Sequence, residues 1–265
     1  MTLTLVNADS SRSHDSASSV VTIQTLGRFS ILAGGQPLVF GGRGQMKPLE
    51  LLRHLVISGG RYVSAERLAQ TMWPNSKQAK HALETTLYRL RKLLGERSIS
   101  VRECHVTLNP AYCRLDIWEL ERALEPEADT TSPLARARKI IDLYRGPFLD
   151  GDVAPAACLQ RERLHAKFLR VIGELGQALE SQSSNTVAAE CYQKGIEVDP
   201  LAEDLYRRLM GCYQKLQRPA DALAVYRRCH NTLISVLRIG PSPQTTALFE
   251  QIQETDSAYG RAQLL

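Results

Sequence analysis

The chain has 265 residues, of which 43% are hydrophobic and 23% charged, and this length favours two domains with buried cores and excludes a wholly disordered chain. Its formal net charge of +5 is uneven, because residues 1–124 carry 16 basic and 10 acidic side chains whereas residues 125–265 carry 17 and 18. A basic first half indicates a polyanionic partner there, although a solvated basic face without a partner accounts for the charge equally well.

The N-terminal segment is polar and is followed by short apolar alternations. Residues 1–19 contain six serines and two acidic residues, and this composition predicts a flexible tail. Residues 21–26, 29–32 and 38–40 then read as strands separated by glycine-containing turns, which predicts a small antiparallel sheet. A helix is expected from near Lys47 up to the glycine pair at 59–60.

Two further helices joined by a short turn follow. Ser64 has the side chain of a helix N-cap, and the helix that it begins should end at Trp73–Pro74. Residues 77–94 form the third predicted helix, because their apolar side chains recur at helical spacing along one narrow face. The residues on this face are Ala79, Leu83, Leu87, Leu90 and Leu94. Short strands are then expected at 99–101, 104–108 and 112–115.

The predicted elements match a winged helix-turn-helix, which has a sheet, three helices with a tight turn between the last two, and a terminal hairpin. Three segments carry a resemblance to a known family: GGRYVS at 59–64, LAQTMWP at 68–74 and LYRLRKLL at 87–94. They resemble the OmpR-type winged helix at the front of bacterial transcriptional activators, including the Streptomyces antibiotic regulatory protein group. We therefore expect a winged helix DNA-binding domain over residues 20–118.

The second half contains an internal repeat with a spacing of 34 residues. Ala188 and Tyr192 recur as Ala222 and Tyr226, and 34 residues is the period of tetratricopeptide helix pairs. Several segments here resemble the bacterial transcriptional activator domain, namely those at 143–149, 161–164, 199–203, 205–210, 226–229 and 240–245. The predicted fold is thus an α+β winged helix-turn-helix followed by an all-α tetratricopeptide-like domain at 125–255 and a C-terminal tail at 256–265.

The outward side of the third predicted helix carries the main candidate DNA-binding residues. By position along the resemblance, His81, Thr85 and Arg89 correspond to readers of base edges, since arginine can pair with guanine and a threonine methyl can contact thymine. Tyr88, Arg91 and Lys92 are interpreted as phosphate contacts. The alternative is that this side is simply the solvated face of an amphipathic helix, and Glu84 departs from a wholly cationic surface.

Other basic residues around this helix are further candidates for phosphate contacts. They are Lys77 and Lys80 beside the helix, Lys47 at the entry to the first helix, Arg43 in the glycine-rich turn, and Arg102 and His105 on the wing. In the second half, the segment at 145–149 is interpreted as a structural turn. The arginine pairs at 207–208 and 227–228 are interpreted as intradomain ion-pair partners, with an acidic ligand as the alternative.

The sequence lacks the motifs of common enzymes and of membrane proteins. Gly42-x-Gly44 followed by Lys47 lacks the Gly-Lys-Ser/Thr of a phosphate-binding loop, and no hydrolase, zinc protease or kinase signature occurs. No apolar run approaches the roughly 18–20 residues that cross a bilayer. The six cysteines form no Cys-x-x-Cys pair, which favours free thiols. We expect a cytoplasmic protein with no catalytic residue, metal, cofactor or membrane partner.

The resemblance implies a sequence-specific transcriptional activator. Its expected partners are double-stranded promoter DNA and the RNA polymerase holoenzyme, and the family binds repeated promoter sequences as a homodimer or a dimer assembled on DNA. Two alternatives remain open at this point. The chain could be a protein-interaction adaptor that uses its helical repeat, or the effector module of a larger signalling system.

Overall fold

The computed structural model describes residues 20–38, 45–125 and 132–262, with side chains up to residue 255. The predicted tail at 1–19, Phe40 and Arg43 lie outside the described residues. The chain forms two compact units. The first unit contains residues up to Thr22 together with Ile31–Arg114, and the second contains Ile23–Ser30 together with Leu115 and all later residues.

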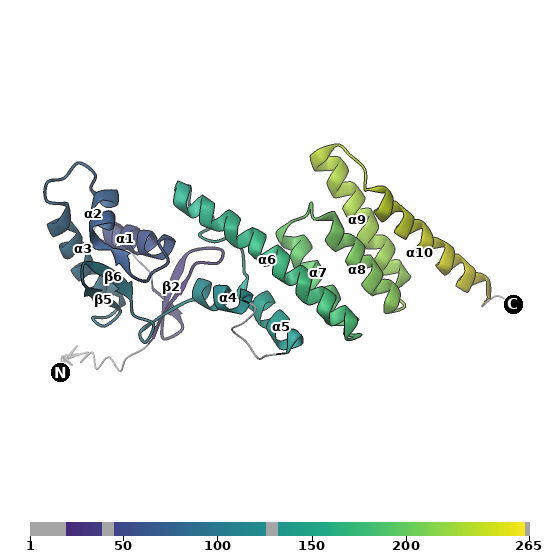
Figure 1. The fold of residues 1–265 in the computed structure, drawn as a ribbon, viewed down its shortest axis with the longest axis horizontal. Helices are drawn as coiled ribbons and strands as arrows, with labels where there is room; N and C mark the ends of the chain where they lie inside the picture. The colour runs from purple at the N-terminus through teal and green to yellow at the C-terminus, as the bar shows by residue number, and fades with distance from the viewer. Residues whose placement is uncertain (1–19, 39–44, 126–131, 263–265) are drawn as a thin grey trace, which may run out of the picture. The chain divides into compact units, whose positions relative to one another are not determined.

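Four short strands form the first sheet (Figure 1). They are β1 (Val21–Gln24), β2 (Ser30–Ala33), β3 (Gln36–Pro37) and β7 (Cys113–Leu115), in the order β3-β2-β1-β7. Gly34 and Gly35 have φ angles of 57° and 81°, and they form the two-residue turn that pairs Ala33 with Gln36. The strand predicted at 21–26 ends earlier, at Gln24, because the next two backbone amides donate to the side chain of Asp116.

Three helices complete the core of the first unit: α1 (Met46–Ile57), α2 (Ala65–Met72) and α3 (Ala79–Leu94). The Ser64 hydroxyl accepts a hydrogen bond from the Arg67 amide at 3.3 Å, as expected of an N-cap. Helix α3 begins at Ala79, two residues later than the sequence predicts. Its buried face contains the four predicted leucines and also Thr86, whereas Ala79 is only partly buried.

The wing is a three-stranded sheet in the order β4-β6-β5. Its strands are β4 (Val63–Ser64), β5 (Ile99–Arg102) and β6 (His105–Leu108). Arg102 pairs with His105, so that Glu103 and Cys104 form a two-residue turn with φ angles of 49° and 60°. This geometry corrects two expectations. Cys104 lies in the turn and not in a strand, and the strand predicted at 112–115 joins the first sheet as β7.

After Leu115, the described part of the second unit consists mainly of helices. Its helices are α4 (Asp116–Leu124), α5 (Pro133–Leu143), α6 (Pro155–Ser181), α7 (Asn185–Val198), α8 (Glu203–Lys215), α9 (Pro219–Leu237) and α10 (Pro243–Ala262). From α6 to α10 each helix packs against the next in chain order (Figure 1). Helix α10 continues through residues 256–262, which the sequence prediction assigned to a C-terminal tail.

The repeat seen in the sequence corresponds to helices α7 and α9. Ala188 and Ala222 occupy matching positions and are both fully buried. Tyr192 is also fully buried, and its hydroxyl donates to Glu180 at 2.5 Å, whereas Tyr226 is partly exposed and stacks on Phe249. The winged helix followed by a tetratricopeptide-like helical domain is therefore confirmed as the fold class.

The segment Ile23–Ser30 belongs to the second unit although it precedes the winged helix in the chain. Its Gly27 amide donates to the Pro147 carbonyl at 2.9 Å, and its Thr25 carbonyl accepts from the Leu149 amide at 2.7 Å. The segment that accepts and donates these bonds, between α5 and α6, is also fixed by Arg161. The side chain of Arg161 donates to the carbonyls of Phe148, Leu149 and Asp152 in that segment. These bonds are the reason that the observed division differs from a boundary at residue 118.

Alanine substitutions at two glycines should change stability in opposite directions. At Gly176 a Cβ would lie 2.4 Å from the ring of buried Tyr192, whereas at Gly211 it would meet nothing within 4 Å. We expect Gly176→Ala to cost about 1–3 kcal/mol through overpacking and Gly211→Ala to stabilise its helix by about 0.5–1 kcal/mol. Thermal unfolding followed by circular dichroism measures both. Equal shifts in melting temperature would contradict the packing of Tyr192 on Gly176.

Arg161→Met should destabilise the second unit, because it keeps the apolar stem but removes the guanidinium donations to the carbonyls of Phe148, Leu149 and Asp152. The Leu149 and Asp152 carbonyls keep a second donor, the Asp152 amide and the Cys158 thiol respectively. We expect a loss of about 2–4 kcal/mol in the free energy of unfolding. Arg163→Met is the matched control, since Arg163 is exposed on the same helix, and its effect should stay within about 0.5 kcal/mol. Urea unfolding of the helical signal measures both, and similar midpoints for the two variants would contradict the role of Arg161.

Candidate nucleic-acid interface

The exposed side of α3 carries the predicted base-reading residues. His81 and Arg89 are exposed and Thr85 is partly exposed, while Leu83, Leu87 and Leu90 on the opposite side are buried. This division follows from the helical period, because residues 81, 85 and 89 are each separated by four positions and so lie along one side. The structure thus presents the three side chains together on one face of α3. What they bind remains a prediction.

One aromatic residue, Tyr88, and one basic residue, Lys92, extend this face towards the C-terminal end of α3. The ring of Tyr88 is 57% exposed, and the Lys92 ammonium lies 5.4 Å from its centroid. Lys92 also forms an ion pair with Glu96 at 2.9 Å, and the hydrogen bond to Glu96 raises the pKa of Lys92 above its usual value. Lys92 therefore stays charged, and any phosphate that it binds competes with Glu96.

Arg91 is placed differently from the other predicted phosphate contacts. Its side chain is partly buried, and its Nε donates to the carbonyl of Ile99 at 3.1 Å. One part of the guanidinium therefore ties α3 to strand β5 of the wing. This contact gives Arg91 a positioning role that the sequence prediction did not include.

The basic residues near the start of α3 are all exposed, and they include Lys77 and Lys80. His81 lies 4.0 Å from Glu84, the single acidic residue within α3. Lys47 in α1 pairs with Glu50 at 2.8 Å and lies 5.9 Å from the centroid of Trp73. Surface pairs of this kind contribute little to stability, so these cations remain available to a polyanion.

The wing brings Arg102 and His105 together as neighbours across its turn, and both are exposed. They line a cavity of about 390 Å³ whose other walls include Tyr62 and Thr107. Sequence reasoning missed Tyr62, which is 81% exposed with a φ of 53° and whose amide donates to the Thr107 hydroxyl. An aromatic residue just before a short strand usually indicates core, so nothing in the pattern marked Tyr62 as a surface residue.

The described part of the chain holds neither a metal-binding cluster nor a disulfide. Among the described residues, no group of three or more histidine, cysteine or acidic side chains is arranged to hold a metal ion. All six cysteines are free, and burial raises the pKa of Cys113, Cys191 and Cys212 to about 12, so these thiols stay protonated. None of the described helices is both long enough and apolar enough to span a membrane.

Comparison with known families assigns both halves of the chain. Residues 115–253 match the bacterial transcriptional activator domain, and residues 43–107 match the C-terminal domain of transcriptional regulatory proteins. The chain is 25% identical over 260 residues to the transcriptional regulatory protein MoaR1 of Mycobacterium tuberculosis, covering 89% of this chain and 82% of MoaR1. It is 29% identical over 226 residues to the regulatory protein AfsR of Streptomyces coelicolor, covering 78% of this chain but 22% of AfsR.

A solved structure has a similar fold. Mycobacterium tuberculosis EmbR, in complex with a low-affinity phosphopeptide, superposes with a TM-score of 0.54 at 23% sequence identity. The superposition covers 89% of this chain and 66% of the EmbR chain, so it supports the order of the two domains and the fold. Taken with the family matches, the chain belongs to the bacterial transcriptional activator domain family and is a transcriptional regulator of the Streptomyces antibiotic regulatory protein type with an OmpR-type DNA-binding domain.

Proposed function

We propose that the chain is a sequence-specific activator that inserts α3 into the major groove of promoter DNA. The observation that carries this proposal is the exposed face of α3, where Thr85 and Arg89 lie opposite a buried face of four leucines and Thr86. A major groove about 12 Å wide admits one helix, and its base edges offer the acceptors and methyl groups that these side chains bind. The proposal includes no catalytic step, and a DNA partner places its action in the cytoplasm.

The remaining basic residues supply a sequence-independent part of the affinity. Lys77, Lys80 and Lys92 are exposed around α3, and Arg102 and His105 are exposed on the wing. Contacts from such residues to phosphates fix the register of a protein on the duplex, and they make binding depend steeply on salt. Arg91, held by the Ile99 carbonyl, orients α3 against the wing and leaves its other nitrogens for a phosphate.

The second unit is proposed to mediate protein contacts on the promoter. Membership of the bacterial transcriptional activator domain family supports contact with RNA polymerase and pairing of two protomers on repeated DNA sequences. Three of the four paired arginines have intradomain partners: Arg207 pairs with Glu203, Arg208 with Glu180, and Arg228 interacts with Tyr206. These contacts argue against a surface on which the arginine pairs bind an acidic ligand. They favour protein interfaces elsewhere on the second unit.

Selection of bound fragments from sheared genomic DNA tests the proposal. The purified full chain is incubated with the fragments at about 50 and 200 mM salt, because non-specific phosphate binding falls steeply across this range. We expect fragments that remain bound at the higher salt to share a repeated motif upstream of genes. Loss of all fragments at 200 mM would contradict sequence-specific binding by the chain alone and would favour an adaptor role for the helical unit.

Arg89→Ala and Lys92→Ala should separate base reading from phosphate contact. We expect Arg89→Ala to relax discrimination at one base position by roughly 1–3 kcal/mol. Lys92→Ala should instead weaken binding to all sequences alike and lower the salt slope by about one. Fluorescence anisotropy with the selected motif and its single-base variants measures both effects, and equal losses on every sequence from the two variants would refute this division of roles.

Substitutions are preferable to deletion in these experiments. Removal of residues 1–124 would take away the whole basic half, but it would also remove Asp116 and the segment Ile23–Ser30 on which the second unit depends. Arg163→Ala is the matched control for loss of one positive charge, because Arg163 is exposed on α6. It should leave both base discrimination and the salt slope unchanged.

A further inference from the structure

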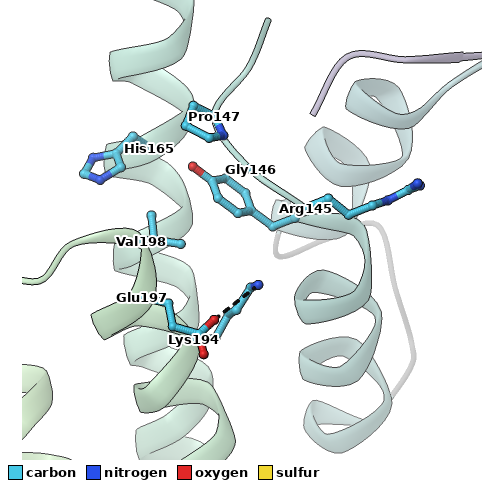
Figure 2. A pocket seen from close by; sticks show the side chains of 8 residues that line it. Arg145, Gly146, Pro147, His165, Lys194, Glu197 and Val198 are labelled. Carbon is cyan, nitrogen blue, oxygen red and sulfur yellow. Dashed lines mark ion pairs between the residues drawn. The ribbon is translucent and has the colours of Figure 1, made fainter. Parts of the chain in front are cut away.

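A cavity of about 260 Å³ lies within the second unit, away from the residues assigned to DNA contact. Three parts of the chain line it: the loop Tyr144–Pro147 after α5, His165 of α6, and the stretch from Lys194 to Val198 of α7 (Figure 2). An engineered apolar cavity of roughly 150 Å³ is enough to hold benzene. The volume therefore suits a ligand of roughly ten non-hydrogen atoms.

Tyr144 contributes an aromatic ring and a hydroxyl to the lining of this cavity. The residue is only 4% exposed, and its ring packs on Phe168 with the centroids 4.1 Å apart. Burial raises the pKa of Tyr144, so the hydroxyl remains protonated and can donate. A protonated hydroxyl in the lining of the cavity can donate to an acceptor of a ligand.

The charged groups of the cavity favour an acceptor-rich ligand. Lys194 is the more buried member of its pair with Glu197, with side-chain exposures of 23% and 59%, and the two charged atoms are 3.5 Å apart. A pair this long leaves the ammonium with unused donors. His165 adds a ring nitrogen, while the side chain of Arg145 points away from the other residues drawn in Figure 2. The cavity lining therefore has more hydrogen-bond donor groups than carboxylates, because its single carboxylate is that of the largely exposed Glu197.

The wall formed by the loop after α5 is rigid before any ligand arrives. A Cβ on Gly146 would lie 3.0 Å from the Cα of Gly27, and the Gly27 amide donates to the Pro147 carbonyl at 2.9 Å. The loop backbone is thus held by a segment that does not itself line the cavity. A wall that is already ordered lowers the entropy lost on binding, which is typical of small-molecule sites.

We propose that this cavity binds a small organic carboxylate with a compact apolar body, which accepts hydrogen bonds from Tyr144 and Lys194. The apolar body packs on the ring of Tyr144 and the side chains of Pro147 and Val198. The site is independent of DNA binding, so its test and the test of the proposed function can fail separately.

Ligand-observed fluorine NMR on the full chain tests the proposal with 4-fluorobenzoate as the probe. Its neutral counterpart 4-fluorobenzamide has nearly the same shape and controls for apolar binding. For a ligand of this size we expect a Kd of about 1 mM for the carboxylate and binding at least about tenfold weaker for the amide. Absence of saturable carboxylate binding at 20 mM, or equal binding of the two compounds, would overturn the proposal.

Two substitutions locate the binding within the cavity. Tyr144→Phe removes only the hydroxyl and keeps the ring contact with Phe168, and Lys194→Met removes the ammonium but keeps the stem. Each should raise the Kd of 4-fluorobenzoate at least fivefold, while Arg163→Met, outside the cavity, should leave it unchanged. The melting temperature of Tyr144→Phe should stay close to that of the parent chain. Unchanged affinity in both folded variants would place the probe elsewhere and refute the site.

Discussion

The buried carboxylate of Asp116 is the interaction on which the arrangement of the chain depends. It is 4% exposed and accepts hydrogen bonds from the Thr25 amide at 2.8 Å, the Thr25 hydroxyl at 2.6 Å and the Leu26 amide at 3.1 Å. It also accepts from the Ile117 amide in the first turn of α4 at 2.9 Å. A charge out of water is tolerated only when its acceptor sites are filled in this way. The same side chain therefore ends β1, begins α4 and joins segments 91 residues apart in the sequence.

Local patterns predicted the elements of the first unit because each helix carries its own apolar period and end signals. The leucines of α3 and the N-cap Ser64 are examples, and both are where the sequence placed them. Thr86 shows the limit of such patterns. Its hydroxyl donates to the Ala82 carbonyl one turn earlier, and this bond allows a polar residue to be buried. The role of Asp116 could not be predicted, because its partners are set by tertiary structure.

The candidate DNA-binding face was predicted from the helical period together with the resemblance, and α3 does present these side chains on one exposed face. The period alone could not distinguish among the basic residues. Arg91 and Lys92 are adjacent in sequence, yet the first donates to the Ile99 carbonyl and the second pairs with Glu96. These partners lie on the wing and beyond the end of α3. Tyr62 was missed for a related reason, since only the pairing of β4 with β6 places it beside Arg102 and His105.

The assignment of Ile23–Ser30 to the helical unit constrains how such proteins can recombine. The chain passes from one unit to the other after Thr22, after Ser30 and after Arg114. Residues 31–114 are thus inserted into the helical unit and do not simply precede it. A gene fusion with one breakpoint near residue 115 would combine a foreign 23–30 segment with the resident Asp116 and Phe148. Exchange of the DNA-binding module between relatives therefore requires two breakpoints, one on each side of residues 31–114.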